Sequence, residues 1–504
     1  MNLAKRVFTV SGWTFLSRIL GLVRDRLFAG AFGVSTTLDA FLMAFQLPNL
    51  LRNLFGEGAL SAAFVPRYVQ LRDKDPAAAE SFAGRVLARL ALGLSALCLV
   101  AMAVAATCVV FAPPATALVA HFALPQLPFM IFICVAAIMG GVLNGRRRFW
   151  VPAAAPVVLN LCLIATVWMD TEDEVHVLPY AVLVAGATQL VLHLAALARS
   201  GGVPPFALAG GPDVRELRRA MAPVVLATGL HQINAFLDTV IAYVFLRDIA
   251  PGAVAILYFG NRLLQFPMAL IAHGVGTAAY PELASRAARG WSATGEGLRV
   301  AGRLLAFFLM PAAVGLFVVA EPLVRAIYQT GSFGVDAVGR TVLVTSFYAL
   351  ALVPMSLAKL QVRAFHVHRD QATPVRVSMA MVALNLALNL LLVNTALREA
   401  GLALASAISA GIGCLTYAVL LRRRGAGATV DLRLLVRPAA AAIAMGVAVW
   451  ALLRWWPQPQ GTGSLIAAAR LAAAVALGAA VYLPIAGVAW LRRRRGAVAE
   501  RVVD

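Results

Sequence analysis

Charged residues are scarce in this chain of 504 residues, where Asp, Glu, Lys and Arg together make up only 13%. Hydrophobic residues make up 61%, against ~45–50% in soluble domains, which excludes a water-soluble fold. Cysteine is also rare. The five cysteines all lie inside apolar runs and none has CxxC spacing, so the sequence predicts neither a zinc site nor a disulfide framework.

Motifs of catalysis and of nucleotide binding are missing as well. The sequence holds no GxSxG, no Walker A and no HExxH, and no paired acidic cluster of the kind that binds a metal ion at a membrane surface. We therefore predict that the protein is not an enzyme and has no cofactor. Without a nucleotide site, the activity of the protein would have to be driven by an ion gradient, the membrane potential or the substrate gradient.

Long apolar runs are what the chain does have. Runs of roughly 20 residues, the length that crosses ~30 Å of hydrocarbon, recur from Val7 to Trp490, and we count about fourteen. The connectors between them alternate between a set rich in Lys and Arg and a set poor in both, which places both termini in the cytoplasm of a multi-pass membrane protein. The 43 basic residues, against 23 acidic ones, then face membrane lipids rather than nucleic acid.

The sequence also repeats itself. FQLPNLLRNLFGEGALSAAFVPRY in the second span resembles YFGNRLLQFPMALIAHGVGTAAYPEL in the eighth, and NGRRRFWVPAAAPVVLN resembles QVRAFHVHRDQATPVRVSMAMVALN. Six spans thus recur in the same order and direction, which is typical of transporters with a binding site between two halves. We predict an all-α membrane protein with two six-helix lobes, at 1–205 and 206–428, related by a parallel pseudo-twofold axis, plus a C-terminal helix pair and tail at 429–504.

The first span carries charges that lipid would not tolerate. A charge at a helix centre costs ~2.5–3.5 kcal/mol, so it is kept where it faces the protein interior or a wet cavity. Ser17 and Arg24 lie on one helical stripe, while Arg18 and Asp25 lie on the adjacent one. Two interpretations stay open: the arginines line a cavity, or Asp25 neutralises a neighbouring residue while Arg24 and Arg26 extend to the outer surface.

The second span carries a polar stripe with steps of three to four residues. Asp39 lies near the outer end of the span, and the stripe that follows consists of Gln46, Asn49, Asn53 and Glu57, with Arg52 beside them. The stripe is either a helix-packing seam or the lining of a cavity. Arg52 favours the cavity, because a cation in a packed seam needs a dedicated partner. Together with Arg262 in the eighth span, these arginines predict an anionic, lipid-like cargo, since guanidinium groups suit phosphates and carboxylates.

Three residues of later spans could supply oxygen ligands to a monovalent cation. Asp238 lies in the seventh span, and Asn385 and Asn389 lie on one face of the eleventh. A carboxylate and amide oxygens are ligands that hard cations accept. The alternative interpretation is a hydrogen-bonded seam between helices.

At this point the residues resemble a known family. GWTFLSRILGLVRDRLFAGAFG, followed by DAFLMAFQLPNLLRNLFGEGALSAAFVP, is similar to the signature of the MurJ (MviN) lipid II flippases of the multidrug/oligosaccharidyl-lipid/polysaccharide (MOP) exporter superfamily. The resemblance covers the whole chain with falling clarity. It implies export of lipid II, the undecaprenyl-pyrophosphate-linked peptidoglycan precursor, across the bacterial cytoplasmic (inner) membrane by alternating access, with cell-wall synthesis enzymes as further partners.

The resemblance also assigns roles to residues. It makes Arg18, Arg24, Arg52 and Arg262 the cavity arginines and Asp39 a required acid, and it places Ser17, Asp25, Asn49 and Glu57 in the same cavity. The last two spans would form a groove for the polyprenyl tail. A sodium site in the family uses a seventh-span acid and an Asn and an Asp of the eleventh span. Asp238 and Asn385 fit that pattern, whereas Asn389 stands where the second acid would be.

Other cargoes and one other class of protein remain as alternatives. A related exporter could carry an O-antigen-like lipid-linked oligosaccharide, which charge alone does not distinguish from lipid II. A cationic drug is disfavoured because a cavity of arginines repels cations. A membrane glycan polymerase should display an essential acid in an outer loop, and the acidic outer run there, DTEDEVH, is interpreted as a solvated turn.

Overall fold

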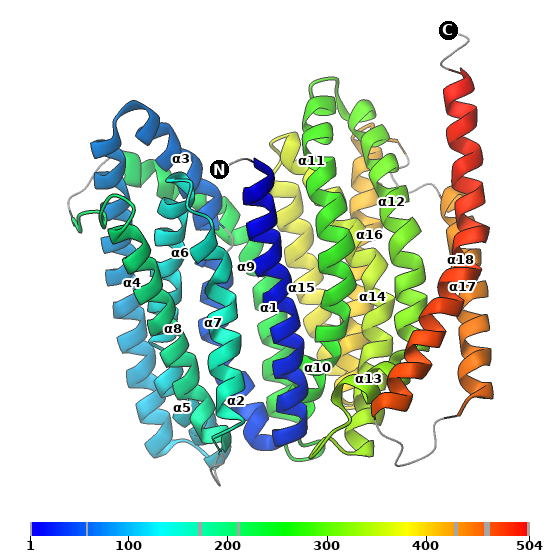
Figure 1. Ribbon diagram of the computed structural model, residues 1–504, viewed down its shortest axis with the longest axis horizontal. Coiled ribbons are helices and arrows are strands. Elements are labelled where there is room, and N and C mark those ends of the chain that lie inside the picture. Colours follow the sequence, from blue (N-terminus) through cyan, green and yellow to red (C-terminus); the bar gives the residue numbers. More distant parts are fainter. Residues whose placement is uncertain are drawn as a thin grey trace. The chain divides into compact units, whose positions relative to one another are not determined.

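The computed structural model describes residues 3–56, 59–169, 174–208, 212–427, 432–457 and 464–500. These ranges hold helices joined by turns and contain no strand, which confirms the predicted all-α class (Figure 1). Contacts divide the chain into unit 1, Met1–Arg247, and unit 2, Asp248–Asp504. Glu57 of the polar stripe, and Glu172 and Asp173 of the acidic outer run, lie outside the described residues.

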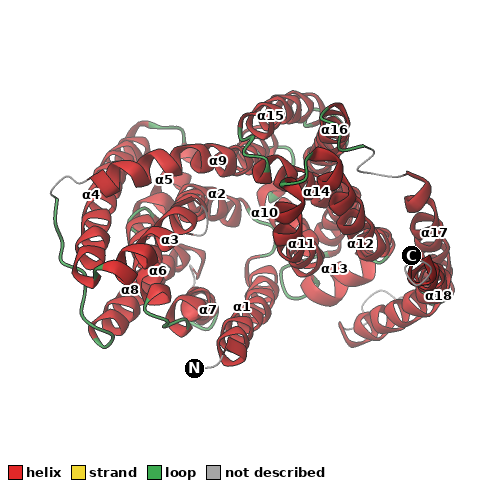
Figure 2. Ribbon diagram, turned by 90° about the horizontal axis from the view of Figure 1, so that it is seen from above, coloured by secondary structure: helices red, strands yellow, loops and turns green. Residues whose placement is uncertain are grey.

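Unit 1 is a bundle of long helices. They are α1 (Leu3–Phe32), α2 (Thr36–Leu51), the π-helical η1 (Arg52–Gly56), α3 (Ala59–Lys74), α4 (Pro76–Phe111), α5 (Pro114–Gln126), α6 (Phe129–Gly145), α7 (Trp150–Thr166), α8 (Glu174–Ala198) and α9 (Pro212–Leu246). In Figure 2, α6 lies beside α3 and α8, and α1 lies beside α7. Phe64, Tyr68 and Phe82, all fully buried, fill the space where α3 and α4 meet.

Unit 2 is built in the same manner. Its elements are α10 (Ala253–Pro267), the π-helical η2 (Met268–Ala272), α11 (His273–Ala287), α12 (Trp291–Val318), α13 (Ala320–Tyr328), α14 (Val335–Val367), α15 (Ala372–Leu392), α16 (Glu399–Arg423), α17 (Leu432–Trp455) and α18 (Ser464–Glu500). The helix α14 packs against α10, α12 and α16, while α17 packs against α12 and α18.

Ten of the described helical segments are long and apolar enough to cross a membrane. Shorter apolar helices cover Trp150–Thr166 and Gln232–Leu246. The first two predicted spans correspond to α1, which carries its charged cluster, and to α2 with α3, which η1 divides. Apolar side chains face outward along α4, where Leu99 is 67% exposed, as a lipid environment allows. The chain is thus a multi-pass membrane protein, and the number of fourteen spans stays a prediction.

Matching local structures recur inside each unit. The helix α2 runs through η1 into α3, and α10 runs through η2 into α11, so each copy of the repeated span contains a π-helical turn. The basic turns after α6 and α14 also match, because Arg147 and Arg369 adopt positive φ angles of 62° and 60°. The backbone nitrogens of Arg147 and Arg148 donate to the carbonyl oxygens three and five residues earlier in the chain. The backbone nitrogens of Arg369 and Asp370 make the same two hydrogen bonds. These shared details support the internal repeat.

The turn after α14 is tied to the end of α16 by an acid. Partial burial alone would raise the pKa of Asp370. Hydrogen bonds from the backbone nitrogen and the hydroxyl of Thr373, together with the nearby charge of Arg424, have a larger effect in the opposite direction. The pKa of Asp370 therefore lies below its ordinary value. The carboxylate is therefore charged at neutral pH, and its contact with Arg424 fixes the two helix ends together.

Gly84 of α4 and Gly295 of α12 make matching contacts in their units. A Cβ atom on Gly84 would lie 1.8 Å from the backbone oxygen of Pro205, and one on Gly295 would lie 1.8 Å from that of Ala426. The helix α4 thus packs directly on the connector after α8, and α12 packs directly on the connector after α16. Each of these connectors follows the sixth and last span of one copy of the repeat. The chain has room at these two points only for a residue without a side chain.

Replacing Gly84 with Ala is expected to lower the free energy of unfolding by about 1–3 kcal/mol, the usual cost of overpacking. The matched control is Gly93→Ala in the same helix, where a Cβ would meet nothing within 4 Å. That change should be neutral or stabilise by about 0.5–1 kcal/mol, because Ala favours helix more than Gly does. Thermal unfolding of the purified proteins in detergent measures both, and equal effects would contradict the packing described above.

Candidate substrate-binding site

Arg24 of α1 is held by an acid and an amide. Its Nη2 and Nε donate to Oδ1 of Asp25 at 2.6 and 3.0 Å, and its Nη1 donates to Oδ1 of Asn160, on α7, at 3.0 Å. Asn160 in turn donates through Nδ2 to the backbone oxygen of Ser17 at 2.9 Å. Ser17 and Arg24 therefore share a partner on one face of α1, as the helical stripe predicted.

The ion pair between Arg24 and Asp25 is buried. Arg24 is 8% exposed and Asp25 is 0% exposed. Asp25 therefore neutralises a neighbouring arginine, as one interpretation held, but the expectation that Arg24 extends to the outer surface was wrong, because its side chain is buried against Asp25 and Asn160. A pair of this kind keeps both charges in place where neither could stay alone in an apolar setting. Arg18, on the adjacent stripe, is exposed.

Arg52 begins the π-helical segment η1 and is oriented by amides. Its Nε and Nη2 donate to Oδ1 of Asn49 at 3.2 and 3.0 Å, and Nη2 also donates to Oδ1 of Asn53 at 3.0 Å. Asn53 donates to Oε1 of Gln232, on α9, at 3.1 Å. Short π-helical turns are frequent at functional sites, and Pro48, one turn earlier, removes a donor from the helical ladder of α2. Asn49 and Arg52 of the predicted stripe are thus brought together.

Asp39 is 1% exposed in the first turn of α2. The N-cap of that helix is Ser35, whose hydroxyl accepts a hydrogen bond from the backbone nitrogen of Leu38 at 3.2 Å. An acid in this turn interacts favourably with the positive end of the helix dipole. The structure therefore gives Asp39 a helix-stabilising position, and its predicted requirement for transport stays a prediction.

Arg262 lies on α10 and is half-buried, with its guanidinium carbon 5.9 Å from the ring centroid of Tyr258. A cation at this distance over an aromatic ring is attracted by the ring's electron-rich face. The contact lies within unit 2, whereas the clusters around Arg24 and Arg52 lie within unit 1.

The two asparagines of the predicted cation site are linked to each other. Asn389 donates to Oδ1 of Asn385 at 2.9 Å, and Asn385 donates to the hydroxyl of Ser406 at 3.4 Å. Both are almost fully buried, which suits the hydrogen-bonded seam. Asp238 belongs to unit 1, so the predicted ligand set draws on both units and stays a prediction. Groups of three or more His, Cys, Asp or Glu residues that could hold a metal ion are absent from the described ranges.

Several partners in these clusters were not predicted. Arg24 is positioned by Asn160, and Asn53 is positioned by Gln232. Gln46 is positioned by Thr239. A signal for Asn160 did exist, because it ends the repeated segment that also ends in Asn385. Gln232 and Thr239 belong to no repeated segment or motif that we recognised.

Solved structures define the class of this fold. A lipid II flippase MurJ in an inward closed conformation matches with a TM-score of 0.80 and 23% identity, covering 96% of this chain and 99% of that one. An inward-facing MATE family transporter of the MOP superfamily matches with a TM-score of 0.68 and 14% identity, covering 81% and 94%. This chain therefore shares the fold of these two membrane transporters.

Sequence comparisons narrow the class to one family. The family model described as lipid II flippase MurJ matches residues 28–470. The lipid II flippase MurJ of Burkholderia cenocepacia is 31% identical over 97% of this chain and 98% of its own length. A probable lipid II flippase MurJ of Rhizobium meliloti is 32% identical over 100% and 98%. This chain belongs to the MurJ lipid II flippase family, which confirms the resemblance drawn from its opening segments and makes it a transporter rather than an enzyme.

Proposed function

We propose that this protein moves lipid II from the cytoplasmic to the periplasmic leaflet of the bacterial inner membrane by alternating access. The observation that carries the proposal is the placement of Arg24 and Arg52 in predicted membrane spans, each oriented by asparagine side chains. Oriented guanidinium groups bind phosphates through paired hydrogen bonds. The names of the relatives supply the particular cargo, and enzymes that make and use lipid II would be its partners.

The ion pair on α1 would let Arg24 exchange one anionic partner for another during transport. In the structure Asp25 pairs with Arg24, and both side chains are buried. A pyrophosphate that enters the site would compete with Asp25 for the same guanidinium nitrogens. Asn160 contacts a different nitrogen of Arg24, so it can hold the side chain in place during the exchange.

The test is transport by the purified protein in liposomes, scored for lipid II against a lipid-linked O-antigen unit. We expect lipid II to move and the O-antigen unit to move at least tenfold more slowly. Equal rates would show a general carrier of undecaprenyl-linked glycans. Movement of neither lipid under any ion gradient would contradict the proposed function.

We also propose that a Na⁺ gradient or the membrane potential drives transport, with Asp238, the charged member of the predicted ligand set, coupling transport to Na⁺. Carboxylate and amide oxygens fit this hard cation. Replacing Asp238 with Asn removes the one charged ligand and should abolish the Na⁺ dependence of transport in liposomes. An imposed membrane potential, applied without Na⁺, separates the two driving forces. A variant with the full rate and an unchanged response to Na⁺ would exclude this site.

A further inference from the structure

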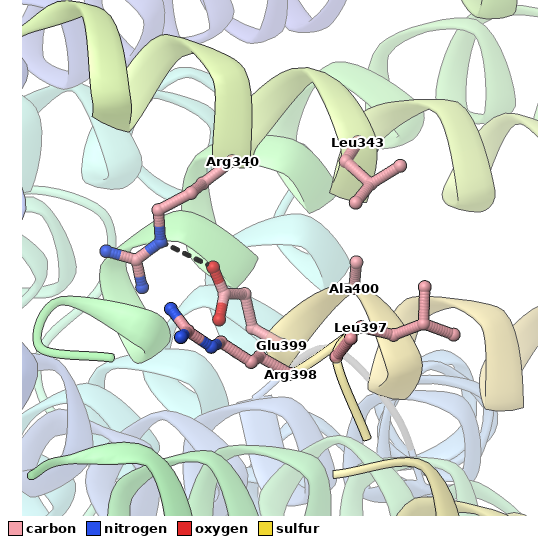
Figure 3. A pocket seen from close by; sticks show the side chains of 7 residues that line it. Arg340, Leu343, Leu397, Arg398, Glu399 and Ala400 are labelled. Atoms are coloured by element: carbon pink, nitrogen blue, oxygen red, sulfur yellow. Dashed lines mark hydrogen bonds and ion pairs between the residues drawn. The ribbon is translucent and has the colours of Figure 1, made fainter. Parts of the chain in front are cut away.

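A cavity of about 210 Å³ lies within unit 2, where the start of α14 faces the start of α16 (Figure 3). Its lining residues are Arg340, Leu343, Ala396, Leu397, Arg398, Glu399 and Ala400. None of them belongs to the predicted cargo site. The connector that holds Arg398 is poor in Lys and Arg, which predicts a position on the periplasmic side of the membrane.

Each of the three nitrogens of the Arg340 guanidinium donates a hydrogen bond to the protein, and Nη1 also lies 3.8 Å from Oδ2 of Asp336. Its Nε donates to Oε1 of Glu399 at 2.6 Å, its Nη1 donates to the carbonyl of Pro251 at 2.9 Å, and its Nη2 donates to the carbonyl of Ala250 at 3.1 Å. These contacts fix the position of the Glu399 carboxylate at the wall of the cavity. They leave the second carboxylate oxygen for another partner.

That second oxygen is an unused acceptor. Glu399 is 3% exposed, and its Oε2 has no hydrogen-bond partner among the described residues. In Figure 3 the carboxylate points into the space between Arg340 and Arg398. A buried carboxylate oxygen without a donor costs free energy, so this position favours a ligand that donates a hydrogen bond, best from a cation.

Arg398 supplies the opposite charge. Its side chain is exposed at the rim of the cavity and makes no hydrogen bond or ion pair with the described part of the chain. Its backbone has φ 48° and ψ −125°, a region that favours glycine. An arginine kept in such a conformation costs free energy, which points to a role for its side chain rather than for the turn.

We propose that this cavity binds the phosphoethanolamine headgroup of a lipid in the periplasmic leaflet. The phosphate would lie on Arg398, and the ammonium would donate to Oε2 of Glu399. Leu343 and Leu397 lie on the other side of the cavity, where the beginning of an acyl chain would contact them (Figure 3). Because Arg340 already compensates the charge of Glu399, the cavity offers the cation of Arg398 for a phosphate and the acceptor Oε2 of Glu399 for an N–H donor, so the site matches a ligand that carries both groups. The proposal does not depend on the cargo of the transporter.

The experiment measures lipid retention by the full-length protein with native mass spectrometry, from micelles that hold equal amounts of phosphatidylethanolamine, phosphatidylcholine and phosphatidylglycerol. We expect the wild type to retain phosphatidylethanolamine preferentially. Phosphatidylcholine has no N–H to offer Glu399, and phosphatidylglycerol has no cation. Equal retention of the three lipids by the wild type would overturn the proposal.

Two variants test the two charges. Arg398→Gln leaves the pair of Arg340 and Glu399 in place and should reduce retention of phosphatidylethanolamine about tenfold, the value of a charge-assisted hydrogen bond. Glu399→Gln should remove the preference over phosphatidylcholine. The matched control is Arg369→Gln, because Arg369 is also an exposed arginine with a positive φ, next to the other end of α14. The same loss in this control would overturn the proposal.

A further variant and a soluble competitor separate binding from structure. Arg398→Gly should raise the thermal stability, because glycine accepts this backbone conformation, while it lowers lipid retention. A purely structural arginine would lower the stability instead. Soluble phosphoethanolamine should fail to displace the lipid at equal concentration, since it lacks the acyl chain. Displacement at equal concentration would assign the site to a free compound and not to a membrane lipid.

Discussion

Replacing Arg24 with Ala is expected to abolish lipid II transport and to destabilise the fold at the same time. Transport should fall by roughly 30-fold or more, because truncating one partner of a buried, hydrogen-bonded charge contact costs ~2–5 kcal/mol. The fold should lose about 3–5 kcal/mol, because the fully buried Asp25 would keep its charge without its arginine. Transport in liposomes and thermal unfolding in detergent measure the two effects.

A double variant separates the two effects. In Arg24→Ala with Asp25→Asn, the buried charge is removed together with its partner, so most of the lost stability should return. Transport should not return, because the guanidinium group that binds phosphate is still missing. Arg199→Ala, at an exposed arginine after α8, serves as the control and should leave both properties unchanged. Recovered transport in the double variant would show that Arg24 only neutralises Asp25.

Replacing Arg52 with Ala is expected to abolish transport with a smaller effect on stability. Arg52 is only partly buried, and the amides of Asn49 and Asn53 that it leaves behind are neutral groups that can hydrogen-bond to each other. The loss of transport should again be roughly 30-fold or more. Measurement of transport and of protein abundance in the same membranes tests this expectation.

Arg52→Lys is the informative companion to that variant. Lysine keeps the positive charge but loses the planar fork that pairs with a phosphate and with two amides at once. We expect an intermediate rate of transport. A rate equal to that of the wild type would show that the charge alone suffices, and that the hydrogen bonds with Asn49 and Asn53 have no part in transport.

Helical periodicity predicted which residues share a face, and it could not predict what faces them. Ser17 and Arg24 were placed on one stripe from their spacing, and both contact Asn160. Asn160 is 136 residues from Arg24 along the chain, so its contact depends on how α7 packs against α1. Only the internal repeat, which pairs Asn160 with Asn385, carried a sequence signal for it.

The compact units of the structure and the predicted internal repeat describe different properties of the chain. The repeat predicted a lobe boundary between residues 205 and 206, whereas the compact units divide after Arg247. The reason is the helix α9, which is bonded to the second span through Gln46 with Thr239 and Asn53 with Gln232. A repeat describes the order of the helices, whereas the units reflect helix packing, in which α9 lies against α2 and α3. The predicted lobe boundaries therefore stay a prediction about the repeat.

The π-helical turns η1 and η2 each set the register between the two parts of the second helix of a copy. A π-helical turn accommodates one more residue than an α-helical turn does. Returning such a turn to the α-helical pattern would rotate everything beyond it by about 100° and shift it by about 1.5 Å along the axis. Because Arg52 is the first residue of η1, this small exchange of backbone partners would re-aim the arginine relative to α3 while leaving both flanking helices intact.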